Sequence, residues 1–265
     1  MAAGTNIRQI LGLEDLAKMK VLSAALLAEF LGTAILVLIG CGSCITGWDL
    51  DYSPTIVQIA LAFGVTVGTV VQFIGHVSGG HINPAVTLGF LVTKKISLFR
   101  AMLYVIVQCL GAIVGAGLLK GLTPSNLQGN LGATVVNQHL SPVQGFVVEL
   151  CITFVLVFTV FACCDENRGD IKGSAPLAIG LSVATCHMFA IKYTGASMNT
   201  ARSFGPAVVA NVWSNHWVYW IGPILGGVIA ALLYQFIFSA PTPPSEESEY
   251  AEKVELREKQ ETPSV

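Results

Sequence analysis

Six long apolar runs constrain this 265-residue chain more than any other feature of its sequence. A helix needs about 20 mainly apolar residues to cross the hydrocarbon core of a bilayer, and each run meets or approaches that length. The runs are Val21–Gly40, Ile56–Gly75, Ala101–Lys120, Val143–Ala162, Ser174–Ala190 and Trp217–Phe238. Only 11% of the residues are charged, against about 25% in a soluble domain. We therefore expect an all-α integral membrane protein with six transmembrane helices.

Two shorter apolar stretches, Asn83–Val92 and Asn199–Val209, each begin at an asparagine. Asparagine is among the best residues for capping the start of a helix, and Pro84 suits the first helical position, where an N–H is not needed. Each stretch is too short to span a bilayer alone, but the two could cross it once if they met end to end. We expect two re-entrant half-helices.

The two halves of the chain resemble each other. The stretch Leu61–Thr69 aligns with Leu177–Thr185 at an offset of 116, and the two asparagines keep the same offset. Each half holds three spans and one half-helix, and because three is odd the second half must be inserted upside down. This inverted 3+3 repeat covers about 21–120 and 143–238, and interrupted segments at matching positions of such repeats point to the functional site.

The basic residues predict the orientation. With six spans, both termini lie on one side, and that side receives 11 of the 14 lysines and arginines. Because basic residues concentrate in cytoplasmic segments, we expect residues 1–20 and 241–265 to be cytoplasmic segments flanking a channel domain at 21–240. The glutamate-rich tail contains Ser245 and Ser248, which are either phosphorylation sites or part of a solubilising segment.

Two helix N-termini that met near the midplane of the membrane would add their partial positive charges, about +0.5 each. Such a site repels cations and orients a neutral dipole by its oxygen. The alternative is that the two half-helices merely plug the bundle. We favour the first interpretation because a plug needs neither the matching caps at Asn83 and Asn199 nor the nearby Arg202.

The two asparagine segments resemble the signatures of the aquaporin (major intrinsic protein) family. They read SGGHINPAVTLG at 78–89 and YTGASMNTARSFGP at 193–206. The resemblance covers about residues 20–240 and is strongest to the water-selective animal members, insect ones among them. It implies an aquaporin-like fold, a homotetramer and one pore in each subunit. The pore motifs carried over from the family are Asn83, Pro84, Ala85, Asn199, Thr200 and Ala201.

The family resemblance also implies a selectivity filter made of Phe63, His187, Ala196 and Arg202. Bulky Phe63 and His187 would narrow the passage, and Arg202 would supply hydrogen-bond donors and a positive barrier, as in the channels of this kind that exclude protons and cations. Glycerol-conducting relatives usually have a small residue in place of His187 and an aspartate in place of Ser203. Water selectivity is therefore expected.

Other residues receive roles from the same resemblance. Buried Glu29 and Glu149 would accept backbone N–H groups of the re-entrant loops, which makes proton transport the less favoured interpretation of these intramembrane acids. His76 either lines the cytoplasmic half of the pore or packs in the bundle, and Cys186 is a candidate pore-lining thiol. The main departure from the family is Thr200, where proline is usual.

The expected function is passive, osmotically driven water transport across the cell membrane, with water as the permeant and the lipid bilayer as the surroundings of the protein. The alternatives are a broader channel for glycerol, urea, ammonia or peroxide, a junction or adhesion protein of low permeability, and a coupled transporter. The sequence lacks paired catalytic carboxylates, a nucleophile elbow and a phosphate loop, so no enzyme is expected. Nor do we expect a cofactor, a metal or a nucleic-acid partner, since the net charge is −2 and no basic patch is present.

Overall fold

The computed structural model describes residues 10–49, 51–170 and 173–242, and within these residues every regular element is a helix. Six helices are long and apolar enough to cross a membrane. They are α3 (Met19–Gly42), α4 (Ile56–Ser78), α6 (Leu98–Leu122), α7 (Pro142–Cys163), α8 (Ala175–Thr194) and α10 (Val218–Leu233), the last continued by the π-helix η1 (Tyr234–Phe238). The predicted all-α architecture with six spans is confirmed.

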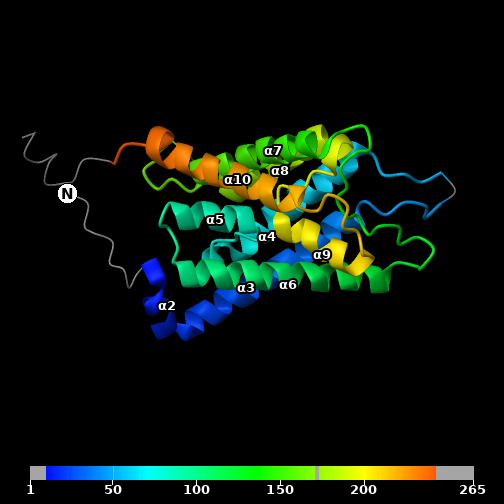
Figure 1. Cartoon of the computed structure of the whole chain (residues 1–265). Coiled ribbons are helices and arrows are strands. Elements are labelled where there is room, and N and C mark those ends of the chain that lie inside the picture. Colours follow the sequence, from blue (N-terminus) through cyan, green and yellow to red (C-terminus); the bar gives the residue numbers. More distant parts are fainter. Residues whose placement is uncertain (1–9, 50, 171–172, 243–265) are drawn as a thin grey trace, which may run out of the picture.

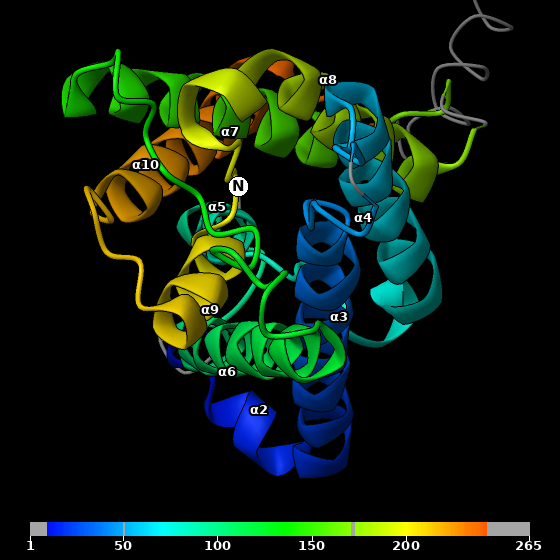
Figure 2. The ribbon, with the colours of Figure 1, turned by 90° about the vertical axis from the view of Figure 1, so that its right-hand side faces the viewer.

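The two half-helices are α5 (Pro84–Val92) and α9 (Thr200–Ala210). In the view along the bundle, α9 lies between α6 and α10, with α5 behind it (Figure 2). In the side view, α5 and α9 occupy opposite halves of the bundle (Figure 1), with their N-terminal ends meeting at its middle. The expected pair of re-entrant half-helices is therefore present.

Hydroxyl side chains define where four of the long helices begin. Thr55, Ser97, Ser141 and Ser174 each accept a hydrogen bond from the backbone N–H three residues further on. At Ser141 the bond is reciprocal, because the side chain of Gln144 also accepts the Ser141 N–H. Such caps satisfy amides that the first turn of a helix leaves free.

Glycines at matching positions of the two halves allow the helices to pack closely. A Cβ added at Gly111 of α6 would lie 2.3 Å from the carbonyl oxygen of Phe30 in α3. A Cβ added at Gly226 of α10 would lie 2.2 Å from the carbonyl oxygen of Leu150 in α7. Backbones of neighbouring helices approach this closely only where the side chain is absent, which is typical of helix packing in lipid. The equivalence of the two contacts reflects the inverted repeat.

The N-terminal segment contains a helix that was not predicted from the sequence. Residues Leu13–Ala17 form a short helix, α2, and α3 begins at Met19, before the expected Val21. The α2 helix lies at the same end of the bundle as the end of η1 (Figure 1), as an even number of spans requires. Ser245 and Ser248 lie outside the described residues.

Candidate functional site

Glu29 of α3 organises the loop that leads into α5. The side chain is fully buried. Its Oε1 accepts hydrogen bonds from the Ser78 hydroxyl at 2.7 Å and the His81 N–H at 2.8 Å, and its Oε2 accepts the Ile82 N–H at 2.6 Å. The Nε2 of Gln108 also donates to Oε2 at 2.8 Å. A buried carboxylate with this many donors is well satisfied.

Glu149 of α7 does the same for the loop that leads into α9. It is also fully buried. Its Oε1 accepts the Thr194 hydroxyl at 2.6 Å and the Ser197 N–H at 2.9 Å, and its Oε2 accepts the Met198 N–H at 2.9 Å. The two glutamates therefore hold equivalent loops through equivalent bonds, at the positions that the sequence repeat predicts.

Tyrosine hydroxyls also bind the residues at which the same loops begin. Tyr104 of α6 donates to the carbonyl oxygen of Ser78 at 2.8 Å, and Tyr219 of α10 donates to that of Thr194 at 2.8 Å. Both tyrosines are fully buried. This pair was not predicted from the sequence, although Tyr104 and Tyr219 stand at nearly the same offset as the asparagines.

The two asparagines cap their own half-helices and also bind each other's loop. The Oδ1 of Asn83 accepts the Ala85 N–H at 2.8 Å, and that of Asn199 accepts the N–H groups of Ala201 and Arg202 at 3.0 and 3.2 Å. Their Nδ2 atoms cross over: Asn83 donates to the Met198 carbonyl at 2.8 Å and Asn199 donates to the Ile82 carbonyl at 2.7 Å. One proton of each amide is thus engaged, and the second has no acceptor in the described part of the chain.

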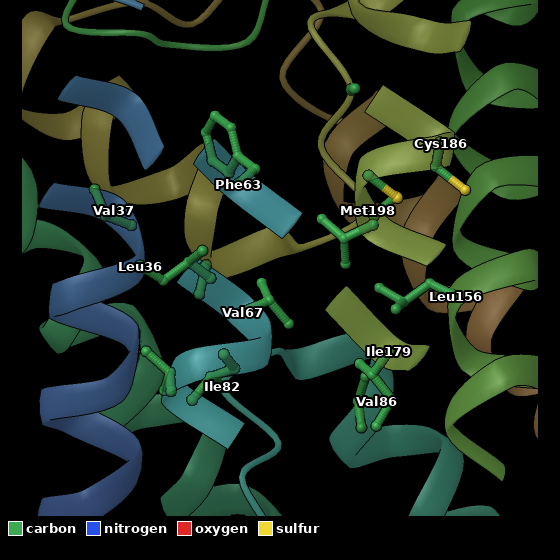
Figure 3. Close-up of a cluster of buried hydrophobic side chains, with 14 of the residues drawn as sticks. Leu36, Val37, Phe63, Val67, Ile82, Val86, Leu156, Ile179, Cys186 and Met198 are labelled. Atoms are coloured by element: carbon green, nitrogen blue, oxygen red, sulfur yellow. The ribbon is translucent and has the colours of Figure 1, made fainter. Parts of the chain in front are cut away.

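A cavity of ≈ 520 Å³ lies beside this junction and has two kinds of wall. One wall is polar and includes both asparagines and Ser197. The other is apolar, and its side chains come from different helices and converge on the middle of the bundle (Figure 3). Among them are Leu36, Val67, Val86, Leu156 and Ile179.

Phe63, His187 and Arg202 form a cluster that also lines the cavity. The rings of Phe63 and His187 stack with their centroids 4.4 Å apart, and the Arg202 guanidinium carbon lies 4.6 Å from the centroid of the Phe63 ring. The Nδ1 of His187 lies 2.9 Å from the Val183 carbonyl, which leaves Nε2 without a partner among the described residues. His187 and Arg202 are almost fully buried, and Arg202 Nε also has no hydrogen-bond partner among the described residues.

The segment between α6 and α7 folds back to hold Arg202. The carbonyl oxygen of Gly132 accepts a hydrogen bond from Arg202 Nη1 at 2.8 Å. The hydroxyl of Thr134 donates to that of Ser203, one residue after Arg202, at 2.8 Å. Gly132 has a φ of +67°, which favours glycine. No role for this segment was predicted from the sequence, in which Gly132 is its only signal.

The remaining predicted residues lie in different surroundings. His76 lines the cavity, whereas Ala196, Pro84, Ala85, Thr200 and Ala201 are buried behind its surface. Cys186 is buried against α7, where its Sγ lies 3.5 Å from the Ile152 carbonyl, and it is not among the residues that line the cavity. The side-chain hydroxyl of Thr200 has no hydrogen-bond partner in the described part of the chain.

The family model described as "Major intrinsic protein" matches residues 16–234. The chain belongs to this family. The Aquaporin-4 of Mus musculus is 55% identical over 217 residues, which are 81% of this chain and 67% of that protein. The human Aquaporin-5 is 52% identical over 214 residues, which are 80% of each chain. These mammalian relatives confirm the resemblance to animal members, while the narrower one to insect members stays a prediction.

A solved structure agrees with the fold. The aquaglyceroporin from Plasmodium falciparum superposes with a TM-score of 0.74, covering 82% of this chain and 96% of that one at 24% identity. Family membership points to a channel rather than an enzyme. Together with the six apolar helices, it makes the chain a multi-pass membrane protein.

Proposed function

We propose that this chain is a water-selective channel that conducts water passively, in single file, down an osmotic gradient. The cluster of Phe63, His187 and Arg202 carries this proposal. Two rings stacked 4.4 Å apart and a guanidinium 4.6 Å from one of them leave little room for a solute with a carbon skeleton. Ala196 is proposed as the fourth, small residue of this filter.

The polar wall of the cavity would replace the hydrogen bonds that water loses on leaving bulk solvent. We assign this role to the free amide protons of Asn83 and Asn199 and to the unpaired Nε2 of His187. The apolar wall offers water no competing partners, so the donors on one side orient each molecule. The motif residues Pro84, Ala85, Thr200 and Ala201 form the first turns of the half-helices that position these donors.

Exclusion of protons and cations follows from the charges in the same region. The N-termini of α5 and α9 both point to the middle of the bundle, and each contributes a partial positive charge of about +0.5. Arg202 adds a full positive charge at the filter. Aquaporin-type channels use these two elements against protons and cations. Glu29 and Glu149 are proposed as loop supports and not as proton carriers, because their oxygens already accept several hydrogen bonds each.

Stopped-flow light scattering on proteoliposomes tests the proposal. Under a sucrose gradient we expect shrinkage much faster than in empty liposomes of the same lipids, and under a glycerol gradient no re-swelling beyond that of the empty liposomes. Shrinkage at the rate of empty liposomes would contradict the water-channel function. Fast shrinkage followed by fast re-swelling would contradict the selectivity alone.

We further propose that the protein is a homotetramer in the cell membrane with both termini in the cytoplasm. The family resemblance supports the tetramer, and the concentration of lysine and arginine on the side of the termini supports the orientation. The channel domain is proposed to span residues 21–240. Mass photometry of the detergent-solubilised protein tests the oligomeric state. Labelling of intact cells, with a cysteine introduced in the tail of the protein, tests the orientation.

A further inference from the structure

A crevice separates α2 from the turn that joins α5 to α6. It encloses ≈ 260 Å³ and lies at the end of the bundle that carries both described ends of the chain. It is separate from the cavity between the half-helices, with which it shares no lining residue. Nothing in the proposed water channel requires it.

The walls of this crevice are held in place. Asp15 of α2 forms an ion pair with Arg100 of α6, accepts a hydrogen bond from Arg100 Nε at 3.0 Å, and accepts another from the Ser97 hydroxyl. Gly12 packs so tightly on this point that an added Cβ would lie 2.6 Å from Ser97 Oγ. The crevice is therefore a fixed feature of the fold rather than a gap beside a loose segment.

The opposite wall is a hydrogen-bonded turn that carries two lysines. The N–H of Lys94 donates to the Leu91 carbonyl at 2.9 Å, and the N–H of Lys95 donates to the Phe90 carbonyl at 2.9 Å. The backbone of both lysines is thus anchored to the end of α5. Their side chains are exposed, as is that of Lys18 across the crevice.

The charges that line the crevice do not balance. The cations are Lys18, Lys94, Lys95 and Arg100, and the carboxylates are Glu14 and Asp15. Arg100 is paired with Asp15, and no lysine belongs to an ion pair in the part of the chain that the structure describes. Three lysines therefore face the single carboxylate of Glu14. Lysine ammonium groups are compact charges that commonly bind phosphate.

The surroundings of the crevice are those of a lipid headgroup. Three apolar side chains, Ile10, Leu91 and Ile96, line it together with the lysines. Beside it, Leu13 and Leu16 of α2 are exposed, as in helices that lie in the membrane interface. Basic residues next to the ends of membrane spans attract anionic lipids. We propose that this crevice binds the phosphate of an anionic lipid headgroup through Lys18, Lys94 and Lys95.

Native mass spectrometry of the full-length protein, titrated with phosphatidylinositol 4-phosphate, tests this site. The variant K18Q/K94Q removes two of the lysines, and K120Q/K192Q removes two from the last turns of α6 and α8 at the other end of the bundle. We expect K18Q/K94Q to weaken lipid binding by about tenfold or more. The lipid affinity of K120Q/K192Q should be close to that of the unmodified protein. Lys94→Arg, which keeps the charge, should retain binding.

The proposal is overturned if no lipid is retained, if the two double variants lose lipid binding equally, or if Lys94→Arg loses as much lipid binding as K18Q/K94Q. Inorganic phosphate added to the lipid-bound protein separates the two sources of a phosphate group. If phosphate displaces the lipid completely, the crevice is an anion site for soluble phosphate and the lipid assignment is wrong. Unchanged water permeability of K18Q/K94Q in proteoliposomes shows that the variant is folded.

Discussion

Asn83 and Asn199 are linked by an exchange of hydrogen bonds in which each donates its side-chain amide to the loop that precedes the other. The distances are 2.8 Å to the Met198 carbonyl and 2.7 Å to the Ile82 carbonyl. The two half-helices are thereby joined at their N-termini, although 115 and 117 residues separate the bonded partners. The junction of the half-helices, which we propose as the permeation site, is consequently part of one connected network that extends through the loops to Glu29 and Glu149.

The first prediction concerns that network. In Glu149→Gln, one carboxylate oxygen becomes an NH₂ group that faces either the Met198 N–H or the Ser197 N–H and the Thr194 hydroxyl. A buried donor without an acceptor costs about 1–3 kcal/mol, so we expect a lower melting temperature in detergent and a reduced fraction of active channels. The measurements are thermal unfolding by intrinsic fluorescence and osmotic permeability per reconstituted protein.

Glu166→Gln is the matched control, because Glu166 is exposed in the connection between α7 and α8. It makes the same chemical change at an exposed position and should leave the melting temperature and the osmotic permeability unchanged. Equal melting temperatures for the two variants would mean that the Glu149 bonds do not stabilise the second half-helix.

Much of this arrangement could be predicted from the sequence, because the internal repeat can be detected by aligning the two halves of the chain. The spans follow from apolar length, and the half-helices follow from the apolar stretches that begin at Asn83 and Asn199. The direction in which an individual side chain points cannot be predicted from the sequence. Thus the caps at Asn83 and Asn199 could be predicted, whereas the bond from each side-chain amide to the opposite loop could not.

Long-range contacts of irregular segments were also beyond sequence reasoning. The bond from Arg202 to the Gly132 carbonyl depends on how a loop of no regular structure folds back, and a backbone carbonyl has no sequence signature. The ion pair between Asp15 and Arg100, which holds α2 against α6, is also a long-range contact and could not be predicted from the sequence. Cys186 and His187 are neighbours on α8. Because adjacent residues of a helix point in different directions, the side chain of Cys186 faces α7.

The second prediction concerns selectivity. His187→Ala removes one of the two stacked rings, so we expect glycerol permeability to rise by about tenfold or more, while water permeability remains. The control is Met188→Ala, because the neighbouring Met188 is 44% exposed. Glycerol uptake into proteoliposomes measures both variants. If His187→Ala stays impermeable to glycerol, Phe63 and Arg202 alone close the passage to it.

The third prediction concerns helix packing. A Cβ at Gly115 of α6 would lie 2.3 Å from the Ala34 carbonyl oxygen of α3, whereas a Cβ at Gly117, two residues further on, would meet nothing within 4 Å. We expect Gly115→Ala to destabilise the protein by about 1–3 kcal/mol through overpacking and Gly117→Ala to cause no loss. Thermal unfolding in detergent compares them. Similar melting temperatures would show that α6 can move away from α3 without cost.

The fourth prediction concerns pH at the end of the last helix. The pKa of Asp165 is lowered, chiefly by the Ala240 N–H that donates to its Oδ2 at 2.8 Å, with further help from the Asn167 N–H and the Tyr234 hydroxyl. A carboxylate with a lowered pKa stabilises the folded state above its ordinary pKa, near pH 4, and this stabilisation is lost as the pH falls through the lowered value.

We therefore expect acid to release residue 240 from the connection between α7 and α8. Hydrogen exchange of the Ala240 amide, compared between the unmodified protein and Asp165→Asn at each pH, measures this release, and the comparison cancels the intrinsic pH dependence of exchange. The protection lost in Asp165→Asn should be large near neutral pH and should vanish in acid. The Ser239 amide, which donates to Tyr234 instead, is the internal control. A difference that persists unchanged into acid would contradict the role of the carboxylate.

The fifth prediction concerns Thr200, which stands where the family usually has proline. The Asn199 side chain caps Ala201 and Arg202, and the N–H of the first helical residue has no acceptor within its own helix. Proline at position 200 therefore removes nothing that the half-helix needs, as Pro84 illustrates at the matching position of α5. We expect Thr200→Pro to keep water permeability within about a few-fold of the unmodified protein.

Thr200→Val, which replaces a buried hydroxyl that has no partner among the described residues, should unfold at the same or a higher temperature. A change in permeability beyond about tenfold in Thr200→Pro, or a clear loss of stability in Thr200→Val, would mean that the hydroxyl or its N–H holds part of the pore.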